Sequence, residues 1–182
     1  MSQPCKRTTA LEGVIEITRH PHEDYRGRFL NVFRRRDWAQ IWGEQRPIEQ
    51  VNLSQNPRPG TVRGLHLQRG EHPEVRLITC VKGRVWDVAV DLRPSSVTHG
   101  RWVAVELSSE AGNSLLIPTG CAHGFQVLEA DSELLYLHGA PYYPSDETGV
   151  RWDDPTLAVA WPLEPRGLSE RDRNLPLLEW ER

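Results

Sequence analysis

Short apolar or alternating runs, each closed by glycine or proline, fill the middle of this chain. Turn-forming segments such as Asn56-Pro-Arg-Pro-Gly60 and Glu110-Ala-Gly-Asn113 separate the runs. The predicted strands cover residues 48–54, 61–67, 75–82, 84–92, 102–107, 114–117, 124–128 and 133–138. Such short strands bury their apolar faces only by packing together, so the pattern predicts an all-β sandwich or barrel.

The flanking segments extend this core without adding a second one. Strands are predicted within residues 13–33, at 14–17 and 28–33, and a short helix at 37–42. Past Pro144 several prolines exclude a long helix, so residues 144–182 should wrap the barrel as a tail. With 182 residues in all, we expect a single domain over 1–182, with its barrel at about 48–140.

Composition narrows the function classes. The formal net charge of -3 argues against a nucleic-acid partner, while local arginine clusters keep a small anionic ligand open. No apolar run approaches the roughly 20 residues of a membrane span. Three widely spaced cysteines without a C-x2-C pair fit reduced thiols. We therefore expect a cytoplasmic protein that binds neither nucleic acid nor membrane.

Two glycine-led segments each end in a histidine. They read G-x5-H-x-Q around His66 and G-x5-P-x-G-x2-H around His123, the two half-motifs of a cupin-type jelly-roll barrel with both histidines in its mouth. A metal-binding cupin has histidine two residues after the first, because such residues share a strand face. Gln68 stands there instead, and an amide is a poor metal ligand. We expect a substrate in the mouth and no metal or other cofactor.

Two further side chains are candidates for the cavity. Alternation through residues 133–138 puts Tyr136 and His138 on one face, from which the Tyr136 hydroxyl would reach the cavity. Arg76 begins a strand that soon becomes apolar, and a cation there requires an anionic partner, a ligand or solvent.

Ordered motifs extend these observations over nearly the whole chain, from about Val14 to Pro176. They include Asp24-Tyr-Arg-Gly-Arg-Phe29, Gln50-Val-Asn52, Arg63-Gly-Leu-His66-Leu-Gln68, Gly83-Arg-Val-Trp-Asp87, Ile117-Pro-Thr-Gly-Cys-Ala-His123, Tyr142-Tyr143, Trp152-Asp-Asp-Pro155 and Leu168-Ser-Glu-Arg-Asp172. In this order and number they resemble the dTDP-4-dehydrorhamnose 3,5-epimerase family. The resemblance implies a cupin-fold homodimer without metal or cofactor that acts on a nucleotide-linked 4-keto-6-deoxyhexose, with dTDP as the carrier.

The resemblance also assigns the chemistry. A ketone at C4 acidifies the hydrogens on C3 and C5, so a base removes one proton and an acid on the opposite face returns it with inversion. By the family pattern His66 is the base, Tyr136 the acid, Asp172 the partner of the His66 imidazole, and Arg76 the group that stabilises the enolate oxygen.

The same pattern implies the substrate-binding set. Arg26 and Arg63 would contact the diphosphate through the guanidinium fork. Phe29 and Tyr142 would pack against the base. The other predicted contacts are Asn31, Gln50, Asn52, His123 and Arg171.

Two positions depart from the family pattern. Arg76 stands where the family has lysine, which keeps the charge but removes a proton donor. Asn31 stands where an acidic residue helps to recognise thymine. These departures leave the nucleotide and the number of inverted carbons open, so a 3-only or 5-only epimerase is an alternative.

Two hypotheses from different functional classes also fit the residues. A metal-dependent cupin oxygenase or isomerase would use His66, His123 and Glu71 or Glu74 as ligands. A binding module that has lost catalysis would keep the pocket without the reaction.

Asp172 has a possible structural role as well. It fits a capping box begun by Ser169, in which an acidic side chain closes the first turn of a short helix. We expect this role to compete with pairing to His66.

Overall fold

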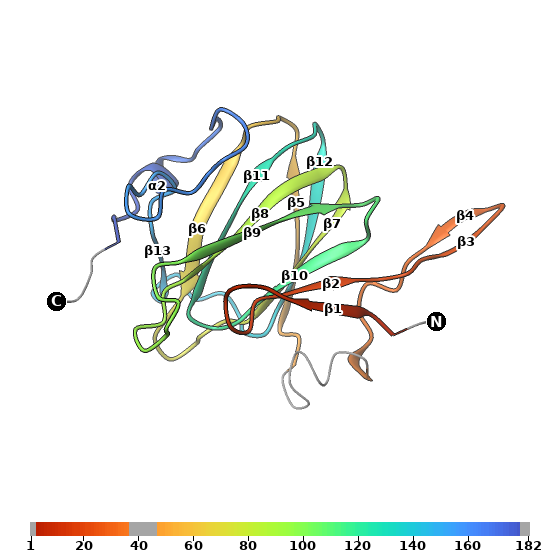
Figure 1. The fold of residues 1–182 in the computed structure, drawn as a ribbon, viewed down its shortest axis with the longest axis horizontal. Helices are drawn as coiled ribbons and strands as arrows, with labels where there is room; N and C mark the ends of the chain where they lie inside the picture. Colours follow the sequence, from red (N-terminus) through yellow and green to blue (C-terminus); the bar gives the residue numbers. More distant parts are fainter. Residues whose placement is uncertain (1–2, 37–46, 179–182) are drawn as a thin grey trace.

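The computed structural model describes residues 3–36 and 47–178 (Figure 1). The predicted helix at 37–42 lies outside these residues. The strands are β1 (Cys5–Thr8), β2 (Ile15–Thr18), β3 (His22–Asp24), β4 (Gly27–Phe29), β5 (Gln50–Asn56), β6 (Val62–Gln68), β7 (Arg76–Lys82), β8 (Arg84–Asp91), β9 (Trp102–Ser108), β10 (Asn113–Ile117), β11 (Cys121–Val127), β12 (Ser132–His138) and β13 (Glu147–Gly149). A short helix, α2 (Glu170–Arg173), lies in the C-terminal tail.

Two antiparallel sheets form the walls of the barrel (Figure 1). One has the order β1-β2-β10-β7-β12-β5 and the other the order β13-β6-β11-β8-β9, while β3 and β4 make a separate hairpin. The main core lies between the sheets, where Ile78 and Leu134 of the first pack with Ala89 and Phe125 of the second. The predicted all-β, cupin-type barrel is confirmed.

Most predicted strands match observed ones, but β3 and β13 were not predicted, and three further differences follow. The segment predicted as 124–128 begins at Cys121, because β11 is buried along its whole length and so shows no alternation. The segment predicted as 28–33 ends at Phe29, in the β3–β4 hairpin. Strand β1 was not predicted, since its four residues are all exposed and carry no apolar pattern.

The C-terminal tail covers the outer face of the five-stranded sheet, as expected. Its residues Val150, Leu157 and Trp161 pack over Leu65 and Val88. Full burial of an aliphatic side chain stabilises a fold by about 1.5–3 kcal/mol, so this second cluster holds the tail firmly in place. The tail therefore brings α2 to a fixed position beside β6.

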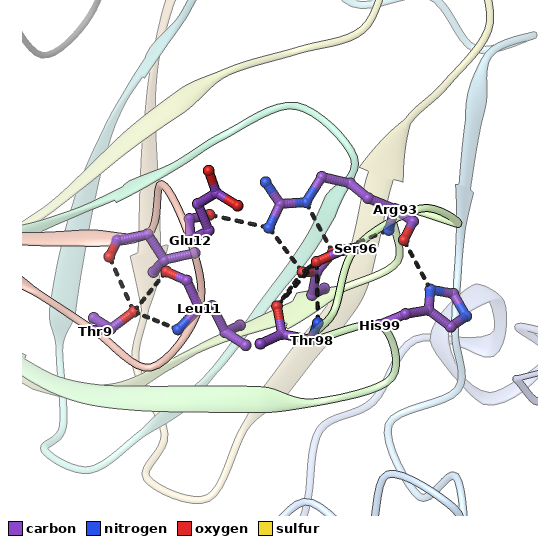
Figure 2. Close-up of polar contacts among 9 residues, drawn as sticks. Thr9, Leu11, Glu12, Arg93, Ser96, Thr98 and His99 are labelled. Carbon is purple, nitrogen blue, oxygen red and sulfur yellow. Dashed lines mark hydrogen bonds and ion pairs between the residues drawn. The ribbon is translucent and has the colours of Figure 1, made fainter.

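A buried carboxylate fixes the loop between β8 and β9. Asp91 accepts hydrogen bonds from Arg93, Ser96 and Thr98, and Arg93 also donates to the Glu12 carbonyl at 3.0 Å (Figure 2). Burial would raise the pKa of Asp91, but these donors outweigh it and hold the pKa well below its usual range. The loop is thus tied to the β1–β2 turn.

The helical and cysteine content of the described residues is small. No helix among residues 3–36 and 47–178 is both long enough and apolar enough to cross a membrane. Cys5 is exposed, Cys80 and Cys121 are buried, and all three are free thiols.

Candidate active site

A cavity of about 440 Å³ lies where the two sheets meet the tail, a volume typical of small-ligand sites. The six-stranded sheet contributes residues of β5, β7 and β12, and the other sheet contributes residues of β6 and β11. The lining residues are Asn52, Ser54, Arg63, His66, Arg76, His123, Phe125, Tyr136, His138, Gly167, Ser169, Arg171 and Asp172.

A bulge in β6 places two of these side chains in the cavity. His66 pairs with His123 and Arg63 with Phe125, so Gly64 and Leu65 together oppose the single residue Gly124. Arg63 and His66 are three apart and would face opposite sides of a regular strand. The extra residue turns both to the same side.

Glycine makes that bulge possible. Gly64 has φ +119°, and a Cβ there would lie 2.6 Å from the Cα of Gly124 and 2.8 Å from the His123 carbonyl. No side chain fits so close to another backbone. The Arg63-Gly64-Leu65-His66 motif therefore has a structural basis in the approach of β6 to β11.

His66 pairs with Asp172, as the sequence predicted. The His66 Nε2 lies 2.6 Å from the Asp172 carboxylate, which reaches the cavity from α2. Burial would raise the pKa of Asp172, but its bond to His66 and the nearby positive charges outweigh burial and lower the pKa. The carboxylate is thus held ionised beside the ring.

The prediction that helix capping would compete with pairing to His66 is wrong. Ser169 is the N-cap of α2, and its hydroxyl accepts a hydrogen bond from the backbone N–H of Asp172 at 3.0 Å. The cap bonds to the backbone N–H of Asp172 while its carboxylate bonds to His66, so Asp172 serves both roles at once. Capping by Ser169 fixes the turn that delivers Asp172.

Tyr136 lines the cavity from the opposite sheet. Its ring lies 6.0 Å from that of His123 in an edge-to-face arrangement. Burial, with a smaller contribution from Asp87, raises the pKa of the Tyr136 phenol far above its usual value. The group is therefore a protonated phenol at neutral pH.

His123 belongs to a second pair, deeper in the barrel. Its Nε2 lies 2.9 Å from Asp87, which is fully buried. Burial raises the pKa of Asp87, although His123 and Arg76 act in the other direction. Among the residues that the structure describes, the other carboxylate oxygen of Asp87 has no hydrogen-bond partner and is buried.

Arg76 has the anionic partner that its position requires. Its NH2 group contacts the carboxylate of Glu74, which also bonds to His138 Nδ1. Burial would raise the pKa of Glu74, but the His138 bond and the Arg76 charge outweigh it and lower the pKa. Arg76 and His138 line the cavity, whereas Glu74 does not.

Gln68 does not lie where the sequence placed it. It is buried, its amide donates to the carbonyls of His72 and Pro141, and its oxygen accepts from the Tyr143 N–H. The strand ends at this residue, and the surrounding loops cover it. Gln68 therefore fastens loops behind the cavity instead of lining its mouth.

The two histidines predicted for a metal-dependent cupin, and Glu74 of its two candidate glutamates, are engaged in other pairs. His66 bonds to Asp172, His123 to Asp87, and Glu74 to Arg76 and His138. In the part of the chain that the structure describes, no group of three or more histidine, cysteine, aspartate or glutamate side chains is placed to hold a metal ion.

Eight of the predicted site residues line the cavity and the others lie elsewhere. Neither Gln50 nor Tyr142 lines it; the Tyr142 N–H donates to Gln50 Oε1 at 3.1 Å, and Gln50 donates to the lining residue Asn52. Arg26 and Phe29 lie on the β3–β4 hairpin, which projects from the barrel (Figure 1). Phe29 is 60% exposed there, Arg26 pairs with Asp24, and neither lines the cavity. Asn31 follows the hairpin and is also absent from the lining.

Several lining residues were missed by the sequence analysis. Ser54, Phe125, His138 and Gly167 were not predicted to belong to the site, nor was the buried carboxylate Asp87, and Glu74 was considered only as a ligand of a metal-dependent cupin. For His138 a signal existed, because it shares a strand face with Tyr136. The others depend on pairings between distant strands.

The chain is similar in sequence to named proteins. The chain is 42% identical over 156 residues to a dTDP-4-dehydrorhamnose 3,5-epimerase from Sinorhizobium fredii, covering 85% of this chain and 80% of the relative. It is 37% identical over 172 residues to a dTDP-4-dehydrorhamnose 3-epimerase from Streptomyces niveus, covering 94% and 83%.

Solved structures extend the likeness to the fold. NovW from Streptomyces spheroides, a 4-keto-6-deoxy sugar epimerase, has a TM-score of 0.91 at 36% identity and covers 97% of this chain and 88% of its own. A dTDP-6-deoxy-D-glucose-3,5-epimerase from Legionella pneumophila, solved with dTDP-4-keto-L-rhamnose, has a TM-score of 0.90 at 35% identity, covering 96% and 92%. The dTDP-4-dehydrorhamnose 3,5-epimerase family model matches residues 8–179. The chain therefore belongs to the dTDP-4-dehydrorhamnose 3,5-epimerase family of isomerases.

Proposed function

We propose that this protein inverts C3 and C5 of a dTDP-linked 4-keto-6-deoxyhexose through an enolate. The observation that carries the proposal is the placement of a histidine–aspartate pair and a protonated phenol on facing sheets of one cavity. His66 comes from β6 and Tyr136 from β12, and both line the space between. Inversion at carbon requires a base on one face of the sugar and an acid on the other.

His66 is the proposed base. With its Nε2–H directed at Asp172, the lone pair on Nδ1 takes the proton from C3 or C5. The electrons of the C–H bond form the enolate at the C4 carbonyl. Asp172 stabilises the imidazolium that results, because its carboxylate is held ionised.

Tyr136 is the proposed acid and Arg76 the proposed anion-stabilising group. The phenol gives its proton to the same carbon from the opposite face, and solvent then restores both side chains to their starting states. Arg76 stabilises the negative enolate oxygen by charge and hydrogen bonding, without transferring a proton. Arg63, Arg171 and His123 line the remaining wall and are proposed to contact the diphosphate and sugar.

A homodimer would complete the site. Arg26 and Phe29 were predicted to contact the nucleotide, yet neither lines the cavity of its own chain, and their hairpin projects from the barrel (Figure 1). We propose that the hairpin reaches the cavity of a second copy, where Phe29 packs on the base and Arg26 meets the diphosphate. The free thiols fit a reducing compartment, and we place the protein in the cytoplasm.

Isotope exchange tests the proposal. Incubated in D2O with dTDP-4-keto-6-deoxyglucose, the protein should incorporate deuterium at C3 and C5. Tyr136→Phe should still exchange the proton taken by His66 but yield at least about 10²-fold less inverted product, because the returning acid is gone. NMR and mass spectrometry of the sugar measure both. Absence of exchange by the intact protein would overturn the proposal, and full turnover by Tyr136→Phe would remove Tyr136 from it.

A 3-only epimerase is the second candidate, motivated by the similarity to the Streptomyces niveus 3-epimerase. The same experiment separates the two. Deuterium confined to C3 with a single inverted centre supports the 3-only reaction, whereas label at both carbons supports the 3,5-epimerase.

A further inference from the structure

A chain of hydrogen bonds runs along the cavity wall from Gln50 to Arg76. Its members are Gln50, Asn52, His138, Glu74 and Arg76, named here the relay. Strands β5, β12 and β7 carry it across the sheet, since His138 is the registered neighbour of both Gln50 and Arg76. The relay joins Gln50 and Asn52, predicted as substrate contacts, to Arg76 through His138 and Glu74.

The backbone N–H of Tyr142 fixes the orientation of Gln50, and the directions of the next two bonds in the relay follow from it. The N–H of Tyr142 only donates, and it lies 3.1 Å from Gln50 Oε1, so the Gln50 amide nitrogen faces the other way. That nitrogen donates to Asn52 Oδ1 at 3.0 Å. The Asn52 amide nitrogen is thereby turned to His138 Nε2, at 3.2 Å.

These directions determine the state of the His138 ring. An amide nitrogen only donates, so His138 Nε2 accepts and carries a lone pair. The ring proton then lies on Nδ1, which bonds to one oxygen of the Glu74 carboxylate. His138 is consequently neutral, and the charge of Glu74 is balanced by Arg76 on its other oxygen.

The far end of the relay holds a charged group against the cavity. Arg76 bonds to Glu74 through NH2 and contacts the His66 carbonyl through NH1 at 3.4 Å. The side chains of Glu74, Arg76 and His138 are only 9%, 11% and 12% exposed. The guanidinium is thus tied at two points inside a wall, with its carboxylate partner behind the cavity.

We propose that His138 is a positioning residue of the epimerase site: as the Nδ1–H tautomer it fixes Glu74, and Glu74 fixes the guanidinium of Arg76 toward the substrate. Arginine has a long, flexible side chain, so one anchor leaves it several rotamers. Without the His138 donor, the Glu74 carboxylate loses a partner and turns, and Arg76 moves with it. The kinetic part of this inference rests on the proposed function.

Two substitutions of His138 separate its two ring nitrogens. In His138→Asn the amide nitrogen occupies the place of Nδ1 and still donates to Glu74. In His138→Gln the amide lies where Nε2 was and that donor is lost. We expect kcat of His138→Gln to fall by about 10- to 100-fold with KM changed by less than about threefold, because displacing a catalytic group by about 1 Å has an effect of this size.

His138→Asn should recover most of that loss. Glu74→Gln, which keeps the size but removes the charge, should resemble His138→Gln. Glu133→Gln is the matched control, since Glu133 lies on the same strand and pairs outside the cavity with Lys82. Thermal unfolding of each variant identifies any that fail to fold.

A readout without turnover completes the test. In the wild-type protein labelled with ¹⁵N-histidine, the His138 ring should show a proton on Nδ1 and a lone pair on Nε2. A ring protonated on Nε2, or on both nitrogens, overturns the inference, as does a His138→Gln variant with wild-type kcat or a His138→Asn variant as impaired as His138→Gln. If instead the wild-type protein exchanges no carbon-bound proton, the proposed function fails while the ring tautomer still decides the relay.

Discussion

Two histidine–aspartate pairs lie on adjacent strands, and they differ in exposure, in where the aspartate comes from and in the direction of its pKa shift. His66 and His123 are registered neighbours on β6 and β11. The His66 side chain is 23% exposed and its aspartate comes from the tail, whereas that of His123 is 5% exposed and its aspartate comes from β8. The pKa of Asp172 is lowered by its donors, and that of Asp87 is raised by burial. The same two residue types thus give a partly exposed imidazole in one place and a buried one in the other.

The largest difference between the pairs should appear in turnover. His66→Asn should lower kcat by about 10²–10⁴-fold, since it removes a positioned base. His123→Asn should lower kcat far less but reduce the free energy of unfolding by about 1–3 kcal/mol, because buried Asp87 loses its partner. Steady-state kinetics and urea unfolding of both variants test this. Equal kcat losses would mean that both pairs take part in the chemistry.

Replacing Gly64 tests the bulge in β6 that pairs His66 with His123. Gly64→Ala should destabilise the protein by about 3 kcal/mol or more, combining strain at positive φ with a clash against the Gly124 backbone. Gly27→Ala is the matched control, because Gly27 has φ +125° but nothing within 4 Å of a Cβ. It should cost only about 1 kcal/mol. Equal midpoints for the two variants in thermal unfolding would show that close packing of the strands is unimportant.

The smallest expected effect concerns pH and has opposite signs for the two pairs. The lowered pKa of Asp172 means that its contribution to stability is present above the ordinary value of about 4 and is lost as pH falls through the folded-state value. The raised pKa of Asp87 means that its contribution is present below about 4 and is lost as pH rises through the folded-state value.

Unfolding free energies from pH 2 to 8 for the wild type, Asp172→Asn and Asp87→Asn test these signs. The difference between wild type and Asp172→Asn should grow as pH rises through the acidic range. The difference between wild type and Asp87→Asn should shrink over the same range and above it. Parallel curves would mean that the two carboxylates have similar environments.

Sequence reasoning predicted the barrel because alternation and turn residues are local signals. It was least accurate where the signal depends on tertiary burial, as in β11, which is buried on both faces, and in β1, which is exposed on both. It misplaced Gln68 because strand alternation stops where loop carbonyls take over the amide.

Site residues were predicted where they belong to contiguous sequence motifs. His66 and Tyr136 were expected in one cavity and lie there. The Glu74–His138 contact spans 64 residues in sequence, and only the pairing of β7 with β12 brings the two together. The effect of Gly64 on the direction of Arg63 required the register shift, which residue spacing alone does not reveal.

The tail that shields the five-stranded sheet also supplies Asp172 and its cap. A protease that cut before Ser169 would separate the chain from the carboxylate partner of His66. Loss of the following residues, Leu178 among them, would also thin the cover over Leu65 and Val90, and exposed apolar patches of this kind promote association. Damage to this end of the molecule would therefore remove the carboxylate partner of His66 and expose apolar surface in one event.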